Sequence, residues 1–265
     1  MSSTASIKIH PTAVVSPNAV IGKGVMIGPH TVIGDKVSIG SGCSVGPNTL
    51  IEGPTVIGRN NKFYGHVSVG TDPQDLKYDG SPTRLEIGDD NQIREFVTLN
   101  RGTVGGGGET RIGSRNLLMT GVHVAHDCSV GDDVILANAA TLAGHVDVGD
   151  SATVGAFCGV HQFCRVGVHA FIGGYSVLTR DVLPFVKTVG IRNEAKIYGI
   201  NTIGLERKGF SERRLKALNS AYRTLFRKGW KLKDAVSQIR NSGELTPDVE
   251  ILVEFIETCE RGFVR

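Results

Sequence analysis

The chain of 265 residues lacks any long hydrophobic run, and it is poor in aromatic residues and in cysteine. No apolar stretch approaches the roughly 20 residues that a membrane-spanning helix needs. The first residues have neither the basic segment nor the apolar segment of a secretory signal peptide. The five cysteines are odd in number and show no paired spacing, which indicates reduced thiols rather than a disulfide framework. These absences predict a cytoplasmic protein with no transmembrane segment.

What the chain has in abundance is glycine, with 35 residues, and a hydrophobic repeat of period six. An apolar residue recurs at every sixth position in three runs, which extend over 9–69, 87–99 and 112–178. A period of six fits neither a helix nor an ordinary strand. It is typical of a parallel β-helix, in which three short strands and their turns form one triangular coil of about 18 residues. The repeat therefore predicts a mostly β solenoid with these apolar side chains pointing inward.

The position two before each inward residue is mostly occupied by a small residue. Four of the five cysteines fall in this position: Cys43, Cys128, Cys158 and Cys164. Buried free cysteine behaves as a small hydrophobic residue. We therefore expect these thiols to fill the core and to take no part in catalysis.

Two segments interrupt the repeat, and a different pattern follows it. Residues 71–84 carry charged and amide groups, and such insertions in repeat proteins tend to gather on the binding face. Residues 101–109 are glycine-rich but lack the lysine of a phosphate-binding P-loop, so we expect a flexible turn. Helical spacing after Pro184, with Ser211 and Thr246 as N-caps, predicts a small α-helical domain. The predicted domains are a β-helix over 1–190 and a helical domain over 191–265.

The helical part is strongly basic. Residues 204–233 contain ten Lys or Arg against two acidic residues, whereas the whole chain has a net charge of +3. The excess fits either a solvated helix face or a docking surface for an acidic partner. Nucleic acid is not the predicted partner, because no zinc motif, recognition helix or interleaved exposed aromatic residues accompany the charge.

A cluster of histidines is the main candidate for chemistry. With 18 residues per coil, His126 stacks on Gly144 and Gly144 stacks on Gln162, while His145 and His161 lie beside this column. His123 points outward on the same coil as His126. Three interpretations remain open: a zinc site, unrelated surface histidines at turns, or a general base oriented by the carboxylate of Asp127.

Three stretches carry a resemblance to a known family: "DPQDLKYDGSPTRLEIGDDNQIREFVTLNRGT", "NLLMTGVHVAHDCSVGDDVILANAATLAGHV" and "GVHQFCRVG". Together with the helical tail, they resemble the UDP-N-acetylglucosamine O-acyltransferases of lipid A biosynthesis, within the hexapeptide-repeat acyltransferase class. The resemblance implies a left-handed parallel β-helix and a homotrimer. It also implies transfer of a 3-hydroxyacyl chain from acyl carrier protein to the 3-hydroxyl of UDP-N-acetylglucosamine, the first step of lipid A biosynthesis. No cofactor is implied, since the carrier protein brings its own phosphopantetheine, and no metal is implied.

The resemblance also assigns roles to individual residues. His126 would be the general base, Asp127 its orienting carboxylate, and Gly144 the amide donor to the oxyanion. Gly174 would limit acyl length. The substrate-binding residues implied are Gln74, Asp75, Lys77, His123, His145, His161, Gln162, Asn201 and Arg207.

The chain departs from the family at the nucleotide end. An acidic contact is replaced by Ile203, and a two-residue insertion leaves Arg192 and Asn193 unassigned. The sequence leaves open an N-acyltransferase acting on a 3-amino UDP-sugar or on a later lipid A precursor. It also leaves open a zinc carbonic anhydrase-like protein and a scaffold without catalysis.

Overall fold

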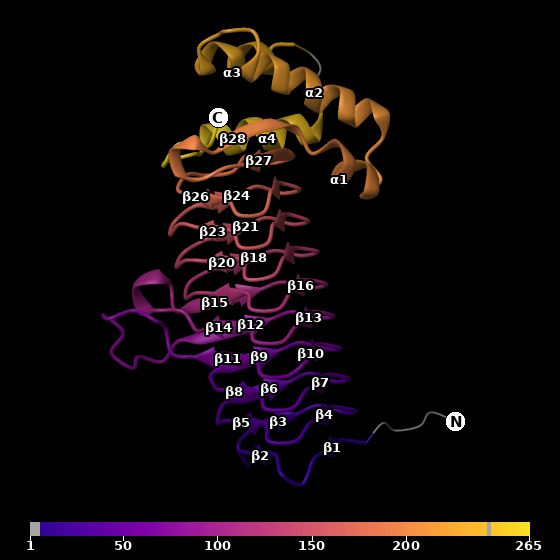
Figure 1. The fold of residues 1–265 in the computed structure, drawn as a ribbon, viewed down its shortest axis with the longest axis vertical. Coiled ribbons are helices and arrows are strands. Elements are labelled where there is room, and N and C mark those ends of the chain that lie inside the picture. Colours follow the sequence, from indigo (N-terminus) through magenta and orange to yellow (C-terminus); the bar gives the residue numbers. More distant parts are fainter. Residues whose placement is uncertain (1–5, 243–244) are drawn as a thin grey trace.

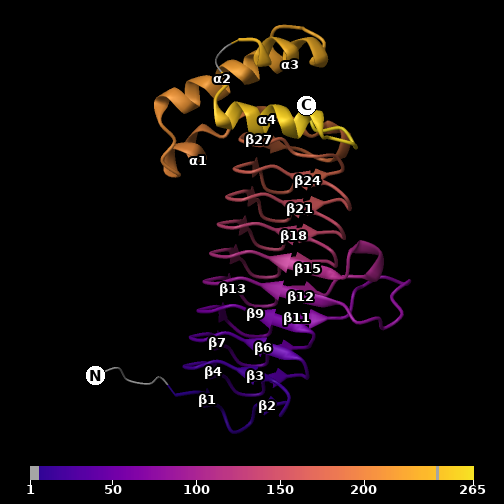
Figure 2. The same ribbon diagram turned by 180° about the vertical axis from the view of Figure 1, so that it is seen from behind.

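The computed structural model describes residues 6–242 and 245–265, which form a tall three-sided solenoid with helices over one end (Figures 1 and 2). The chain rises coil by coil from β1 to β27, so segments about 18 residues apart lie one above the other. The predicted parallel β-helix is confirmed.

The three sides are three sheets of two- to five-residue strands. The first sheet contains β1 (Lys8–Ile9), β4 (Met26–Ile27), β7 (Ser44–Val45), β10 (Lys62–Phe63), β13 (Gln92–Ile93), β16 (Leu117–Leu118), β19 (Ile135–Leu136), β22 (Thr153–Val154), β25 (Phe171–Ile172), β27 (Val186–Val189) and β28 (Lys196–Ile200). The second contains β2 (Val14–Val15), β5 (Val32–Ile33), β8 (Leu50–Ile51), β11 (Ser68–Thr71), β14 (Thr98–Asn100), β17 (His123–Val124), β20 (Thr141–Leu142), β23 (Gly159–Val160) and β26 (Val177–Leu178). The third contains β3 (Val20–Ile21), β6 (Val37–Ile39), β9 (Thr55–Ile57), β12 (Arg84–Ile87), β15 (Glu109–Ile112), β18 (Ser129–Val130), β21 (Asp147–Val148) and β24 (Arg165–Val166).

The six-residue repeat builds the core as predicted. Inward residues such as Ile51, Leu118 and Ile172 are completely buried. Glycine follows many of them because the next coil passes close by. A Cβ on Gly22, for example, would lie 2.7 Å from the backbone nitrogen of Ser41.

The first coil departs from this pattern. Ile9 occupies an inward position, yet its side chain is 46% exposed. It lies in the first strand at the open end of the solenoid, so no preceding coil covers it (Figure 1). Position in the repeat therefore buries a residue only where coils lie on both sides.

The helical part contains α1 (Thr202–Arg207), α2 (Glu212–Phe226), α3 (Leu232–Arg240) and α4 (Pro247–Glu257). The predicted caps are confirmed: the Ser211 hydroxyl accepts a hydrogen bond from the Arg214 N–H, and the Thr246 hydroxyl accepts one from the Val249 N–H. Among the described residues, no helix is long and apolar enough to cross a membrane.

The helices are joined to the solenoid by both strand pairing and charge. β28 pairs antiparallel with β27, so the first sheet continues to Ile200. This strand lies beyond residue 190, and the predicted domain boundary at 190/191 stays a prediction. Arg165 in β24 bonds to the buried carboxylate of Asp181, and one of its guanidinium nitrogens donates to the carbonyl of Phe255 in α4. The top coils therefore hold the helical part directly.

The two interruptions of the repeat leave the solenoid on the same side (Figures 1 and 2). The first connects β11 to β12. The second lies between β14 and β15 and contains a short 3₁₀ turn, η1 (Val104–Gly106). The Arg84 N–H donates to the carbonyl of Gly108, so the two loops touch at their bases.

Candidate active site

His126 and Asp127 form a hydrogen-bonded pair at a turn of the solenoid. His126 Nδ1 lies 2.7 Å from Asp127 Oδ2. The Asp127 side chain is fully buried, and that of His126 is 15% exposed. A carboxylate in this position fixes the imidazole tautomer and leaves Nε2 as the available base. Among the residues that the structure describes, no group bonds to His126 Nε2.

Gly144 lies directly against the His126 ring, as the 18-residue spacing predicts. A Cβ on Gly144 would be 2.6 Å from His126 Cε1 and 2.8 Å from Nε2, so only glycine fits here without displacing the ring. No acceptor within the described residues takes the Gly144 N–H. A free backbone amide therefore lies beside the free nitrogen of His126, which is the arrangement that oxyanion stabilisation requires.

His145 and His123 complete the histidine cluster. His145 Nε2 lies 3.7 Å from Asp127 Oδ2, and its ring stacks on Phe163 at 4.4 Å. His123 Nδ1 lies 2.7 Å from the hydroxyl of Thr98. Burial, and secondly the neighbouring His126, lower the pKa of His123, so this side chain is neutral at pH 7.

His161 and Gln162 are not drawn into this cluster. Both are exposed, and His161 Nδ1 lies 3.2 Å from the carbonyl of Gln162. Within the described part of the chain, no hydrogen bond or ion pair joins either residue to His126. Their predicted contacts with substrate stay predictions.

The predicted sugar-nucleotide residues Gln74, Asp75 and Lys77 lie on the first loop. Gln74 and Lys77 are exposed, and Asp75 accepts a hydrogen bond from the Lys77 N–H at 3.0 Å. No bond in the described ranges connects these three residues to His126 or Asp127. The first loop therefore exposes polar side chains to solvent.

The remaining predicted residues lie toward the helical end. Asn201 precedes α1, and its side-chain amide donates to the carbonyl of His169. Arg207 and Ile203 are exposed on α1. A Cβ on Gly174 would lie 3.3 Å from the nearest atom, the carbonyl oxygen of Ala156.

The segment that departs from the family forms a short exposed turn. Arg192 and Asn193 form the short 3₁₀ turn η2 (Arg192–Glu194), and both are exposed.

Three ligand-type side chains lie close enough together to hold a metal ion. Donor atoms of His126, Asp127 and His145 lie within 4.8 Å of one another. The Asp127 carboxylate, however, already accepts a hydrogen bond on Oδ1 and two on Oδ2, from His126 and from Thr103. This bonding fits an orienting carboxylate, and the absence of a required metal stays a prediction.

The cysteines lie where the repeat predicts. Cys43, Cys128, Cys158 and Cys164 are free and buried. Burial raises the pKa of Cys128 to about 12 and that of Cys164 to about 11. Thiols that stay protonated at neutral pH are poor nucleophiles, which agrees with a core role.

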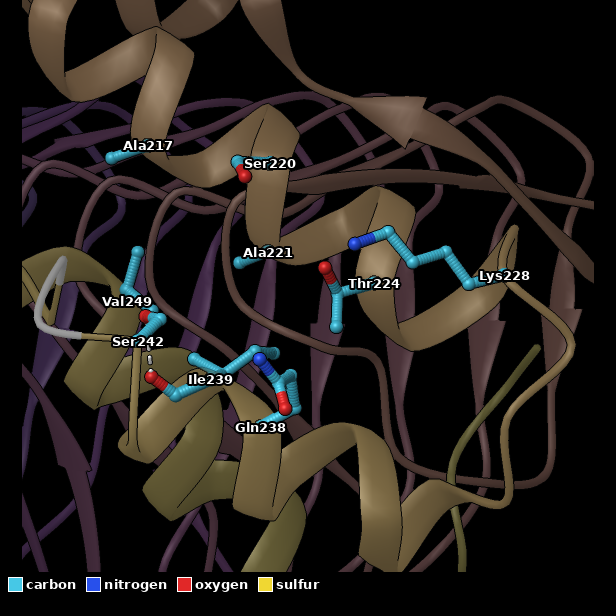
Figure 3. A pocket seen from close by; sticks show the side chains of 9 residues that line it. All are labelled: Ala217, Ser220, Ala221, Thr224, Lys228, Gln238, Ile239, Ser242 and Val249. Carbon is cyan, nitrogen blue, oxygen red and sulfur yellow. Dashed lines mark hydrogen bonds between the residues drawn. The ribbon is translucent and has the colours of Figure 1, made fainter.

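Two hollows differ in their relation to the pair. A cavity of about 110 Å³ lies within the helical part, where Ser220 and Thr224 of α2 and Lys228 just after α2 face α3 (Figure 3), and no solenoid residue lines it. A larger groove of about 660 Å³ is lined by Asp127 and His145, together with Thr258 and Arg261 near the C-terminus. This groove adjoins the histidine cluster.

Sequence reasoning missed two residues of the glycine-rich segment. Thr103 donates both its N–H and its hydroxyl to Asp127, and Arg101 bonds to Asp72 and Tyr78 of the first loop. The sequence predicts only a flexible turn here, because the segment is glycine-rich and lacks the lysine of a P-loop. Its one usable signal was a threonine at the start of a glycine run, the residue type that caps a helical turn.

Comparisons with known proteins identify relatives that match nearly the whole chain. A family model described as UDP N-acetylglucosamine O-acyltransferase, domain 2, matches residues 181–264, and a model of the bacterial transferase hexapeptide repeat matches residues 109–144. An acyl-[acyl-carrier-protein]–UDP-N-acetylglucosamine O-acyltransferase from Alkalilimnicola ehrlichii is 53% identical, over 97% of this chain and 99% of that protein.

Solved structures of similar proteins also match nearly the whole chain. The structure of LpxA from Acinetobacter baumannii is 44% identical with a TM-score of 0.92, covering 97% of this chain and 99% of that one. The UDP-N-acetylglucosamine acyltransferase LpxA from Bacteroides fragilis is 39% identical with a TM-score of 0.94, covering 97% and 100%. These matches confirm the predicted left-handed parallel β-helix with a helical C-terminal part. They give no support to an N-acyltransferase or a zinc carbonic anhydrase. The chain belongs to the UDP-N-acetylglucosamine O-acyltransferase family.

Proposed function

We propose that this protein transfers a 3-hydroxyacyl chain from acyl carrier protein to the 3-hydroxyl of UDP-N-acetylglucosamine, as the first step of lipid A biosynthesis. The observation that carries the proposal is the free Nε2 of His126 beside the free N–H of Gly144, with Asp127 bonded behind the imidazole. The curated relative, which is 53% identical, bears the name of this activity.

The geometry supports a direct transfer. His126 Nε2 takes the proton of the sugar 3-hydroxyl as the oxygen attacks the thioester carbonyl. The carbonyl oxygen becomes an oxyanion and accepts the N–H of Gly144. Collapse of this intermediate breaks the carbon–sulfur bond, and the departing thiolate takes the proton back from His126. The products are the sugar ester and the free phosphopantetheine thiol, and Asp127 stabilises the imidazolium between the two steps.

A homotrimer would assemble the substrate site. The predicted substrate residues lie on the first loop, on the upper coils and at α1 with its N-cap, and no hydrogen bond or ion pair in the described chain joins the three groups. A cleft between neighbouring solenoids brings such groups together. Sedimentation velocity tests this part: a trimer is expected, and a stable monomer that is fully active would contradict it.

The acidic carrier protein would approach the basic helical part. Arg213 and Arg223 are exposed on α2, and neither has a carboxylate partner within the described residues. Opposite charges steer two proteins into an encounter and raise its rate. No cofactor is needed, since the donor carries its own phosphopantetheine. We place the reaction in the cytoplasm, where the five free thiols would stay reduced.

The proposal is tested by identifying the product. Purified protein is incubated with 3-hydroxyacyl carrier proteins of several chain lengths and UDP-N-acetylglucosamine, and the product is analysed by mass spectrometry and mild alkali. An alkali-labile ester is expected. Turnover confined to the 3-amino UDP-sugar, with an alkali-stable amide, would replace the O-acyltransferase assignment. An absence of transfer to either sugar would refute it.

A further inference from the structure

The Asp127 carboxylate is held by the glycine-rich segment as well as by His126. The Thr103 N–H donates to Oδ1 at 2.7 Å, and the Thr103 hydroxyl donates to Oδ2 at 2.6 Å. His126 Nδ1 lies 2.7 Å from the same Oδ2. The carboxylate orientation that sets the imidazole is therefore determined by one threonine as much as by the histidine.

Every polar atom of Thr103 takes part in a hydrogen bond, either to Asp127 or within the glycine-rich segment. It occupies the N-cap position of η1, where a threonine hydroxyl ordinarily accepts a hydrogen bond from the helical turn, but here the hydroxyl makes no such cap. Its carbonyl accepts hydrogen bonds from the N–H groups of Gly106 and Gly108. The segment thus folds back on Thr103 and points the remaining N–H and O–H at Asp127.

Gly106 closes over the same carboxylate. A Cβ on Gly106 would collide with the carboxyl carbon of Asp127 and with both of its oxygens. The backbone of Gly106 does not have positive φ, so the need for glycine here comes from space and not from conformation. The neighbouring Gly105 is exposed, and a Cβ there would meet nothing within 4 Å.

We infer that Thr103 and Gly106 together clamp the orienting carboxylate, with Thr103 as a positioning residue and Gly106 providing the clearance. The inference rests on the proposed function and deepens it, because the clamp acts on the reaction only through Asp127 and His126. Fixed hydrogen bonds to a carboxylate hold both its place and its charge distribution. Loss of the clamp therefore changes the base itself and not substrate binding.

The first test compares Thr103→Val with Thr103→Ser. Valine keeps the shape but removes the hydroxyl, whereas serine keeps the donor. We expect Thr103→Val to lower kcat about 10- to 100-fold, the range for losing one hydrogen bond to a charged group. KM for the sugar nucleotide should stay within about twofold of wild type, because uniform substrate binding is not altered. Thr103→Ser should restore most of kcat.

The pH profile separates positioning from simple structural damage. Without the hydroxyl, more negative charge remains on Oδ2 beside the imidazole, so the protonated histidine is favoured. The acidic limb of the kcat/KM profile should therefore move to higher pH in Thr103→Val and return in Thr103→Ser. A variant that merely folds less completely would lower the whole profile without moving its limb.

A matched glycine pair provides the second test. Gly106→Ala should lower kcat at least as much as Thr103→Val, because the methyl group displaces the carboxylate. Gly105→Ala should retain wild-type kcat and melting temperature. If wild type transfers acyl groups while Thr103→Val and Gly106→Ala match it in kcat and in pH profile, the clamp is refuted and the proposed function stands. If wild type shows no transfer, the proposed function fails first.

Discussion

At the scale of single residues, the site depends on two glycines that have no side chain to fill the space. Gly144 lets the His126 ring lie against the backbone, and Gly106 lets the glycine-rich segment reach Asp127. The stacking of His126 on Gly144 could be predicted, because both residues sit in the regular 18-residue register. The contact between Gly106 and Asp127 could not, because an insertion has no register from which to count.

Substitution of Gly144 tests the first of these contacts. In Gly144→Ala, the new methyl group would overlap the imidazole of His126 and crowd the free amide. We expect kcat to fall by about 10²–10³, the cost of losing one oxyanion donor, with little change in KM. Steady-state kinetics beside thermal melting measures both effects. Normal kcat in the Gly144→Ala variant would remove Gly144 from the mechanism.

At the scale of elements, regular and irregular segments differ in how far the sequence predicts them. The strands follow from one inward residue in six, and the caps of α2 and α4 follow from Ser211 and Thr246, because each signal is local. The contacts of the two loops are not local. Arg101 directly follows β14, and its guanidinium bonds to Asp72 of the first loop, 29 residues earlier in the sequence. Such pairings have no sequence period.

Arg101 should hold the first loop in place. Its side chain is buried, and it donates to the carbonyls of Gly53 and Gly70 as well as to Asp72 and the Tyr78 hydroxyl. Arg101→Met should lower the free energy of unfolding by about 1–3 kcal/mol, since buried carbonyl groups lose their partner.

The same variant should raise KM for the sugar nucleotide more than it lowers kcat, because the loop carries the predicted sugar-nucleotide residues. The control is Arg111→Met, whose arginine is 59% exposed and pairs with Glu86 and Glu109 at the surface. Surface pairs contribute about 0–1 kcal/mol, so the control should unfold almost normally. Equal effects in denaturant titrations of the two variants would contradict the anchoring role.

At the scale of the whole molecule, the solenoid ends under a basic helical cap (Figure 1). Not every basic residue there is available to a partner. Arg214 forms two hydrogen bonds of 2.7 Å with the buried carboxylate of Asp248, and its guanidinium lies over the ring of Phe210. The sequence alone could not separate this structural arginine from its exposed neighbour Arg213.

Charge reversal should therefore use exposed positions only. Arg213→Glu combined with Arg223→Glu should lower kcat/KM for the carrier-bound donor about tenfold at low salt, with less effect as salt rises. Its control is Lys8→Glu with Lys23→Glu, an equal charge change at the open end of the solenoid. The docking idea fails if the two double variants use the carrier equally well.

The junction between solenoid and helices should make stability depend on pH. Burial first, then Lys208 and Arg214, lower the pKa of His169 from 6.5, against the opposing effects of Asp248 and Asp150. The unfolded chain then binds the proton at higher pH than the folded one, so this contribution is complete above about pH 6.5 and is lost on acidification. His123 contributes in the same direction.

We expect the melting temperature to fall between pH 7.5 and 5.5, and to fall less in His169→Gln. His10→Gln, at an exposed position of the first coil, should keep the wild-type slope. Calorimetry at several pH values measures this. A slope that is unchanged in His169→Gln would show that the junction histidine does not titrate on unfolding.

The central claim is that His126 acts as a metal-free general base, and one measurement tests it most directly. The rate of acyl transfer to UDP-N-acetylglucosamine is measured for wild type and for His126→Ala, each with and without a strong chelator. The account predicts that wild-type transfer is unaffected by chelator and that the variant loses about 10²–10⁴ in rate. Loss of wild-type activity on chelation, or near-normal transfer by the variant, would contradict it.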